Sequence, residues 1–288
     1  MSNCKARLEK VREYIELNLD EQINLDTLSK VAHLSKHHFH RLFSVEYGIT
    51  VATYVRLLRL KKAAYQIAYR DDLSITTIAL DCHYESSEAF SRAFRKVFEQ
   101  SPSAFRTEPN WAAWQLHFDG IFKLRNEAFL KYSNFNVEYA ELPTLDVAVF
   151  EHRDSPENLQ YSVGKFIEWR KSNKVPPSRY RTFNLIYDDP EEVVDTSFRF
   201  DLCCQIDKGT DTSDSNISLK TLQGGRCAKI RFVGSDDVIG CAVRYLYSQW
   251  LPQSSETLRD APVLFERVTL FPDVTEHEMV TDVYLPIV

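Results

Sequence analysis

Residues 74–106 read SITTIALDCHYESSEAFSRAFRKVFEQSPSAFR, and this stretch carries two apolar stripes at helical spacing. The first stripe consists of Ile75, Ile78, Ala79 and Cys82, and the second consists of Phe90, Ala93, Phe94 and Val97. Ser74 and Ser86 precede the two stripes at positions where serine is a favoured helix N-cap. A short break at 83–85 separates the two segments. We therefore predict a helix-turn-helix motif in this stretch.

The same pattern occurs earlier in the chain. Leu25 lies 50 residues before Ile75, and Phe39 lies 51 residues before Phe90. Asn24 is the expected N-cap of the earlier copy. A repeat this close predicts two copies of one unit that differ by a single residue in the turn.

Residues 50–70 predict one long helix between the two copies. About 20 residues at roughly 1.5 Å per residue span about 30 Å. This length is close to one turn of DNA, roughly 34 Å. The second helix of each copy is the one that would enter a DNA groove, and we call it the recognition helix. We therefore predict that one chain presents both recognition helices to successive major-groove segments, without a symmetric dimer. Residues 4–19 predict a further amphipathic helix, with Leu8, Val11, Ile15 and Leu19 facing inward.

Polar side chains occupy the outer side of both recognition helices, away from the aromatic stripes. They are Lys36, His37, His40, Arg41 and Ser44 in the first copy, and Ser87, Glu88, Ser91, Arg92 and Arg95 in the second. Arg41 and Arg92 stand at equivalent places, and arginine can bind guanine O6 and N7 with two hydrogen bonds. A phosphate contact or a surface salt bridge is the alternative for each. Glu88 either accepts from cytosine N4 or repels phosphate.

The charge distribution bears on DNA binding, because the net charge of −6 opposes it at first sight. Residues 1–107 hold 16 basic and 13 acidic side chains, whereas residues 134–288 hold 16 basic and 25 acidic ones. The basic excess therefore lies on the helix-turn-helix half, where phosphate contacts require it. Because the excess is small, recognition should depend on specific geometry as well as on bulk charge.

Two strings carry a resemblance to a known family: LSKHHFHRLFSVEYGITVATYVRLLRLKKAA and ITTIALDCHYESSEAFSRAFRKVFEQSPSAFR. Residues 8–106, about a third of the chain, resemble the DNA-binding domain of the AraC/XylS family of bacterial transcription regulators. His33, His83 and Glu99 stand at turn positions where that family usually has glycine, which tolerates positive φ more readily. The resemblance implies that the polar residues of the two recognition helices contact double-stranded promoter DNA.

The second half of the chain predicts an α+β fold built from a tandem repeat. Strands are expected in 136–152, 182–190 and 196–206, and again in 217–234, 263–271 and 278–287. One amphipathic helix is expected in each repeat, at 157–172 and 236–251. Ala148 and Ala228 lie 80 residues apart, Trp169 and Trp250 lie 81 apart, and Pro190 and Pro272 lie 82 apart. We predict two antiparallel-sheet units, each with one helix.

The pieces YDDPEE, WLPQSSETLRDAP, LFERV and TDVYLPI resemble the GyrI-like, or SHS2-type, small-molecule-binding domain. A helix-turn-helix half followed by such a domain is similar to the Rob-type regulators. The resemblance implies that Glu266 faces a pocket for cationic, lipophilic ligands. A carboxylate in a buried strand needs a partner in any case, so pairing with Arg267 or another arginine is the alternative. The repeat would place Asn184 opposite Glu266, and the expected aromatic walls are Tyr187, Trp169, Trp250 and Tyr284.

We divide the chain into a DNA-binding domain at 1–107, a connector at 108–135 and an effector-binding domain at 136–288. The connector is rich in aromatic residues, so we expect it to be ordered and to pack between the domains. The six cysteines form no CxxC motif and indicate reduced thiols in a cytoplasmic protein. The chain has no apolar run of roughly 18–20 residues and no signal segment, so no membrane association is expected.

Motifs of catalysis are absent from the sequence: it contains no GxSxG, P-loop or GxGxxG. We predict no catalytic residue and no cofactor, and no metal site, because the histidines around His37 lack ligands at suitable spacing. The main hypothesis is a transcription regulator that binds promoter DNA, a small effector and RNA polymerase. Some SHS2-type proteins hydrolyse small lipophilic compounds. The alternative is therefore an effector-sequestering or hydrolytic module whose DNA binding is incidental.

Overall fold

A computed structural model describes residues 2–112, 118, 135–190, 193, 198–207, 210, 214 and 216–288. The chain divides into two compact units, Met1–Ala128 and Phe129–Val288. Most of the predicted connector lies outside the described residues. Of its aromatic side chains, Trp111 and Phe118 are described and buried in the core of the first unit, whereas Phe135, also described, packs against the core of the second unit. No described helix is both long enough and apolar enough to span a membrane.

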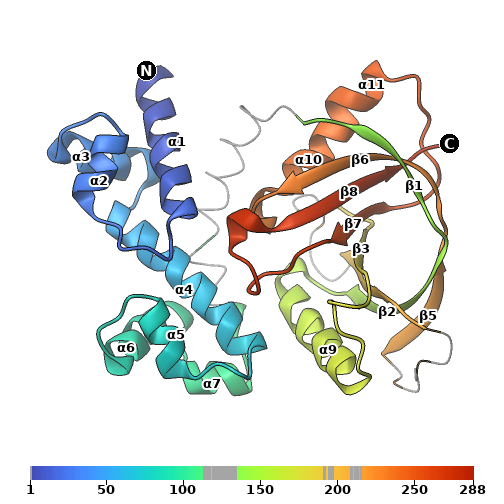
Figure 1. Cartoon of the computed structure of the whole chain (residues 1–288), viewed down its shortest axis with the longest axis horizontal. Helices are drawn as coiled ribbons and strands as arrows, with labels where there is room; N and C mark the ends of the chain where they lie inside the picture. The colour runs from blue at the N-terminus through green and yellow to red at the C-terminus, as the bar shows by residue number, and fades with distance from the viewer. Residues whose placement is uncertain are drawn as a thin grey trace. The chain divides into compact units, whose positions relative to one another are not determined.

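The first unit is helical. Its described helices are α1 (Ser2–Leu17), α2 (Leu25–Val31), α3 (Lys36–Tyr47), α4 (Val51–Tyr69), α5 (Ile75–Asp81), α6 (Ser87–Phe98) and α7 (Pro102–Thr107). The pairs α2–α3 and α5–α6 are the two predicted helix-turn-helix motifs, and they lie at opposite ends of α4 (Figure 1). The first helix ends at Leu17, so Leu19 lies beyond it, although it still packs against the core.

The helix ends follow the sequence closely. Asn24, Ser74 and Ser86 each accept a hydrogen bond from the backbone N–H three residues later, which confirms them as N-caps. Gly48 ends α3 with a φ of 70°. The predicted turn positions His33, His83 and Glu99 all have left-handed backbone, with φ of 51°, 62° and 57°. Three side chains therefore occupy a conformation that favours glycine.

Aromatic side chains form much of the helical core. Phe39 and Phe43 of α3 and Phe90 and Phe94 of α6 are fully buried, as the two stripes predict. Phe94 lies 5.3 Å from Phe105 of α7, between ring centroids, in an edge-to-face contact. These stripes turn the opposite sides of α3 and α6 outward.

The second unit is built around one antiparallel sheet of eight strands in the order β1-β6-β8-β7-β3-β4-β2-β5. The strands are β1 (Glu138–Leu142), β2 (Leu145–Arg153), β3 (Thr182–Ile186), β4 (Arg199–Gln205), β5 (Ile217–Leu222), β6 (Gly225–Val233), β7 (Val263–Arg267) and β8 (Val280–Pro286). Helix α9 (Leu159–Ser172) follows β2, and a helical segment runs through α10 (Gly240–Tyr245) to α11 (Leu251–Gln253). These elements form the predicted α+β tandem repeat.

The two repeats do not form two separate sheets, so our prediction of two sheet units was wrong in this respect. The first strand of each repeat pairs with the second strand of the other: β1 pairs with β6, and β5 pairs with β2. The repeats also join at the centre, where β3 pairs with β7. One continuous sheet results, with β1 and β5 as its edges (Figure 1).

The number of residues between equivalent positions of the two repeats increases by one, and the helix of the second repeat shows where the additional residue lies. The offset rises from 80 at Ala228 to 81 at Trp250. Between them, Leu246–Trp250 is a π-helical segment, which accommodates one additional residue inside a continuous helix. Phe166 and Trp169 pack in α9 at a spacing of three, whereas Leu246 and Trp250 pack at a spacing of four.

The sheet has two distinct faces. On one face, α9 packs over β2, β4 and β5, and α10 packs over β6, β7 and β8. The other face carries a separate apolar cluster to which no described helix contributes: Leu142, Val147, Val149, Phe183, Leu185, Cys203, Cys227, Leu264 and Tyr284. Because side chains alternate along a strand, Glu266 lies on this second face together with Leu264. We call it the Glu266 face.

Candidate DNA-binding surface and effector site

Apart from Ser44, the predicted DNA-contacting side chains lie on the surface of the first unit. Lys36, His37, His40, Arg41, Glu88, Arg92 and Arg95 are exposed, and Ser87 and Ser91 are half-buried. They occupy α3 and α6 opposite the buried phenylalanines. Ser44 differs from the prediction, because its hydroxyl is buried. The remaining residues form one polar surface at each end of α4, and of their equivalent positions only that of Arg41 and Arg92 holds the same residue type in both.

The two arginines in equivalent positions, Arg41 and Arg92, are both solvent-exposed on their helices. Lys36 forms an ion pair with Asp26, so part of its charge is neutralised within the first motif. The positive charge of this surface therefore comes mainly from Arg41, Arg92 and Arg95. Long exposed guanidinium groups of this kind can reach base edges or phosphates.

Glu88 lies in the first turn of α6. Hydrogen bonds from its own backbone N–H and from the hydroxyl of Ser86 lower the pKa of its carboxyl group below the usual value. The carboxylate therefore interacts with the positive end of the helix.

A groove of about 400 Å³ separates the two helix-turn-helix motifs inside the first unit. His40 of the first recognition helix, Arg56 of α4 and Tyr84 of the second turn all line it. Arg59, nearby on α4, donates hydrogen bonds to the carbonyl oxygens of Leu19 and Glu21 at 3.1 and 2.6 Å. These bonds attach the α1–α2 connection to α4.

Glu266 has an internal cationic partner. Its two carboxylate oxygens accept hydrogen bonds from Nε and Nη2 of Arg181 at 2.6 and 2.8 Å. The hydroxyl of Tyr284 also donates to Glu266, at 3.0 Å. Burial and the neighbouring Glu266 charge both raise the pKa of Tyr284, which keeps this hydroxyl protonated as a donor. The arginine partner was expected as an alternative, but it is Arg181 and not Arg267.

The structure divides the six predicted effector residues between the two faces of the sheet. Tyr284 and Tyr187 belong to the Glu266 face. Asn184, Trp169 and Trp250 lie on the helix-covered side. The prediction that the repeat places Asn184 opposite Glu266 was therefore wrong.

The error in placing Asn184 has a simple cause. Its partner across the strands is Phe265, and its side-chain oxygen accepts from Nε of Arg267 at 2.7 Å. The offset of 82 was taken from Pro190 and Pro272, which lie beyond these strands. An offset one residue too large selects the opposite face, because the side-chain period of a strand is two.

The two predicted tryptophans belong to the helices that cover the sheet. Trp169 lies in α9, and Trp250 ends the π-helical segment. Trp169 stacks on Phe166 within α9, with ring centroids 6.0 Å apart. It also lines an open cavity of about 470 Å³ together with Phe150 and Asn216. Trp250 meets the edge strand through Tyr139, at 6.2 Å between centroids. Neither ring reaches the Glu266 face.

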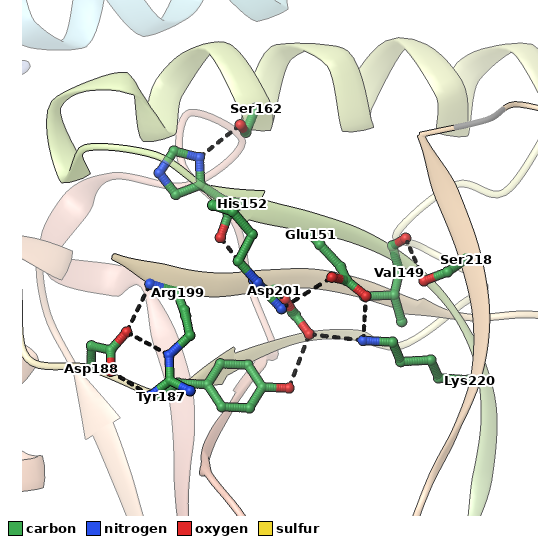
Figure 2. A network of polar contacts seen from close by, with 11 residues as sticks. Val149, Glu151, His152, Ser162, Tyr187, Asp188, Arg199, Asp201, Ser218 and Lys220 are labelled. Carbon is green, nitrogen blue, oxygen red and sulfur yellow. Dashed lines mark hydrogen bonds and ion pairs between the residues drawn. The ribbon is translucent and has the colours of Figure 1, made fainter. Parts of the chain in front are cut away.

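A second ionic group on the Glu266 face was missed at the sequence level (Figure 2). The side chain of Asp201 is completely buried and accepts hydrogen bonds from three groups. These are Nη1 of Arg153 at 2.6 Å, the hydroxyl of Tyr187 at 3.0 Å and Nζ of Lys220 at 3.4 Å. Lys220 also pairs with Glu151 at 2.6 Å. A single acid in the apolar strand RFDLCCQ was the available signal.

Tyr187 is already surrounded by cations within the protein. The guanidinium groups of Arg153 and Arg199 each lie 5.5 Å from its ring centroid. Arg199 is in turn held by Asp188 through two hydrogen bonds, at 3.0 and 2.7 Å. The ring therefore makes internally the cation–π contacts that were predicted for an effector.

His152 lies on the opposite side of β2 and fixes α9 to the sheet (Figure 2). Its Nδ1 is 2.8 Å from the hydroxyl of Ser162, and its Nε2 is 3.1 Å from the carbonyl oxygen of Ser155. Since a carbonyl only accepts, Nε2 carries the proton and Nδ1 accepts from Ser162. Burial lowers the pKa of His152, in agreement with a neutral ring.

The comparisons with known proteins agree with both halves of this architecture. Residues 135–288 match the family model of the GyrI-like small molecule binding domain, and residues 28–108 match a helix-turn-helix domain. The first match spans more than half of the chain. The chain therefore belongs to the GyrI-like family and is an AraC-type, DNA-binding transcription regulator with a small-molecule-binding domain.

Relatives with similar sequences divide between the two halves. The Probable transcriptional regulator YgiV of Escherichia coli K12 is 40% identical over 153 residues, which are 53% of this chain and 96% of that protein. The HTH-type transcriptional regulator YbfP of Bacillus subtilis is 44% identical over 100 residues, 35% of this chain and 34% of that protein. The Right origin-binding protein of Escherichia coli K12 is 35% identical over 101 residues, 35% of each chain. The chain thus matches about a third of the length of these last two proteins.

Proposed function

We propose that this regulator reads an asymmetric promoter site as a single chain, with α3 and α6 in successive major-groove segments. The duplicated motif at the two ends of α4 supports this proposal most directly. This helix has 19 residues, about 28 Å at roughly 1.5 Å per residue. That length is close to the roughly 34 Å of one DNA turn. A monomer then contacts both half-sites.

The effector site that we propose is the Glu266 face of the second unit. Glu266 and Tyr284 meet there at the border of an apolar cluster, which suits a lipophilic effector with a cationic group. Effector binding would change how the first unit engages DNA or RNA polymerase. We propose no catalytic role, and membership in a family of transcription regulators supports this reading over a hydrolytic module.

The DNA-binding proposal is tested with labelled upstream fragments from the source genome and fluorescence anisotropy. We expect one or a few fragments to be preferred at raised salt. Replacing Arg41 or Arg92 with alanine should then cost about 1–3 kcal/mol of binding free energy on those fragments if each reads a base. Lys10→Ala is the control, because it removes one exposed positive charge from α1.

Three outcomes separate the readings. A large and selective loss for both arginine variants supports base recognition. A small, uniform loss equal to that of Lys10→Ala assigns the arginines to phosphate contacts. No preference for any fragment at raised salt would contradict the regulator proposal. Transcription from the preferred fragment with purified RNA polymerase then tests the polymerase contact.

A further inference from the structure

The environment of Glu266 already contains a complete cation-binding arrangement. The carboxylate holds the guanidinium of Arg181 through two hydrogen bonds, at 2.6 and 2.8 Å. The same guanidinium lies 4.9 Å from the ring centroid of Phe183. An anion on one side and an aromatic ring nearby are the features by which proteins bind organic cations.

We propose that Arg181 is an internal cation that occupies the effector's position, so that a cationic effector binds Glu266 by displacing Arg181. This inference rests on the proposed function of the Glu266 face. It adds that Arg181 controls the affinity for the effector, and it adds a condition that the effector must meet. The effector must replace an ion pair and cannot simply fill an unpaired acidic pocket.

Glu266 is the acid of this face that is best placed for such an exchange. Its side chain is 14% exposed and that of Arg181 is 34% exposed. Asp201 is 0% exposed and is held by three donors, and Asp282 is 5% exposed and binds Arg231 through two bonds of 2.7 Å. Of these three acids, Glu266 is therefore the one that solvent and ligand reach most easily.

Arg181 also lies where its side chain can move without disturbing the sheet. It immediately precedes β3, and its carbonyl oxygen accepts a hydrogen bond from the backbone N–H of Gln205 at 2.9 Å. This bond fixes the backbone and leaves the side chain attached through Glu266 and the Phe183 ring. Loss of the ion pair would free the guanidinium toward solvent at the start of the strand.

The charges of Arg181 and Glu266 determine which kind of ligand can displace Arg181. With Arg181 in place the Glu266 charge is neutralised, so an approaching cation gains little electrostatic energy until Arg181 leaves. A small, strongly hydrated cation has nothing to offset that loss. A lipophilic cation would also cover the apolar surface of Phe183 that the departure of Arg181 exposes, which favours the exchange. Neutral compounds gain nothing specific from the departure of Arg181.

The test uses the full chain, the lipophilic monocation tetraphenylphosphonium and isothermal titration calorimetry. We expect Arg181→Gln to bind this cation at least tenfold more tightly than the wild type. Arg179→Gln should bind like the wild type. Arg179 lies two residues away, removes the same charge when replaced and pairs with Asp207 instead of Glu266. Triphenylphosphine oxide, an uncharged analogue, should show no difference between the three proteins.

Glu266→Gln separates this inference from the proposed effector site. If Glu266→Gln abolishes binding but Arg181→Gln binds no more tightly than the wild type, the Glu266 site stands and the role of Arg181 is refuted. If Glu266→Gln binds the cation as the wild type does, or if no variant binds it, the proposed site and the inference both fail. Thermal unfolding of each variant confirms that the protein tested is folded.

Discussion

Three residues in left-handed backbone make a local property of the sequence directly measurable. His33, His83 and Glu99 were identified because a glycine is usual at each position, and all three have positive φ. A side chain with a Cβ atom costs free energy in this conformation, because the Cβ approaches the carbonyl oxygen. The resemblance to the family thus located three such positions before any tertiary contact was known, whereas Lys174, with a φ of 57°, was not predicted.

Glu99 offers the clearest test at this scale. It ends α6, is exposed and donates its backbone N–H to the carbonyl oxygen of Arg95. Glu99→Gly should keep that bond and relieve the strain, raising the free energy of unfolding by about 1 kcal/mol. Urea unfolding followed by tryptophan fluorescence measures the change.

His83→Gly is the matched comparison for this prediction. The ring Nε2 of His83 lies 2.9 Å from the carbonyl oxygen of Asp20, so glycine removes a hydrogen bond while it relieves strain. The two effects are each about 1 kcal/mol, and the net change should be close to zero. Equal stabilisation by both substitutions would show that the Asp20 contact contributes nothing.

At the scale of one element, the π-helical segment Leu246–Trp250 records an insertion in the second repeat. Deleting Ser248, which is exposed, reduces the spacing between Leu246 and Trp250 to that between Phe166 and Trp169. We expect a regular α-helix with both side chains still in the core. The loss of stability should stay within about 1 kcal/mol, measured by urea unfolding.

Deletion of Glu168 in α9 is the control for this prediction. This helix has no additional residue to lose, so the deletion rotates everything after it by about 100°. Trp169 and Arg170, both buried, would leave the core, and the loss should reach several kcal/mol. If both deletions destabilise the protein equally, the π-helical segment is not an accommodated insertion.

For the whole molecule, a fixed separation of the two recognition helices predicts a specific response to changes in the DNA. Inserting five base pairs between the half-sites places them on opposite sides of the duplex and should abolish recognition of one of them. Inserting ten restores the side but adds about one DNA turn, roughly 34 Å. A single chain with α4 as a rigid spacer should not recover its affinity.

This response is measured by anisotropy on the preferred fragment, with stoichiometry from sedimentation. We expect one chain per site on the natural spacing. Recovery of affinity on the ten-base-pair insertion would contradict the rigid spacer, because it would require two chains or a flexible connection between the motifs. The salt dependence on each fragment reports how many phosphate contacts are retained.

For the whole molecule, sequence patterns did not predict which charged side chains pair across the sheet. Glu266 was correctly singled out as a carboxylate that needs a partner, but the partner, Arg181, lies 85 residues earlier. Asp201 received no attention, although three donors from β2, β5 and the residue after β3 converge on it. Ion pairs across a sheet depend on which strands are neighbours, and a repeat offset that errs by one residue reverses the face.

What the sequence alone determined is the set of properties that depend on neighbours a few residues away. These include the duplicated motif, the helix caps and the change in offset between the two repeats, since periodicity acts locally. Only the tertiary structure decided that β1 and β5 each pair with a strand of the other repeat, and that Arg181 meets Glu266 across the resulting sheet. Strand pairing between distant segments is selected by the burial of whole faces, which no single stretch of sequence encodes.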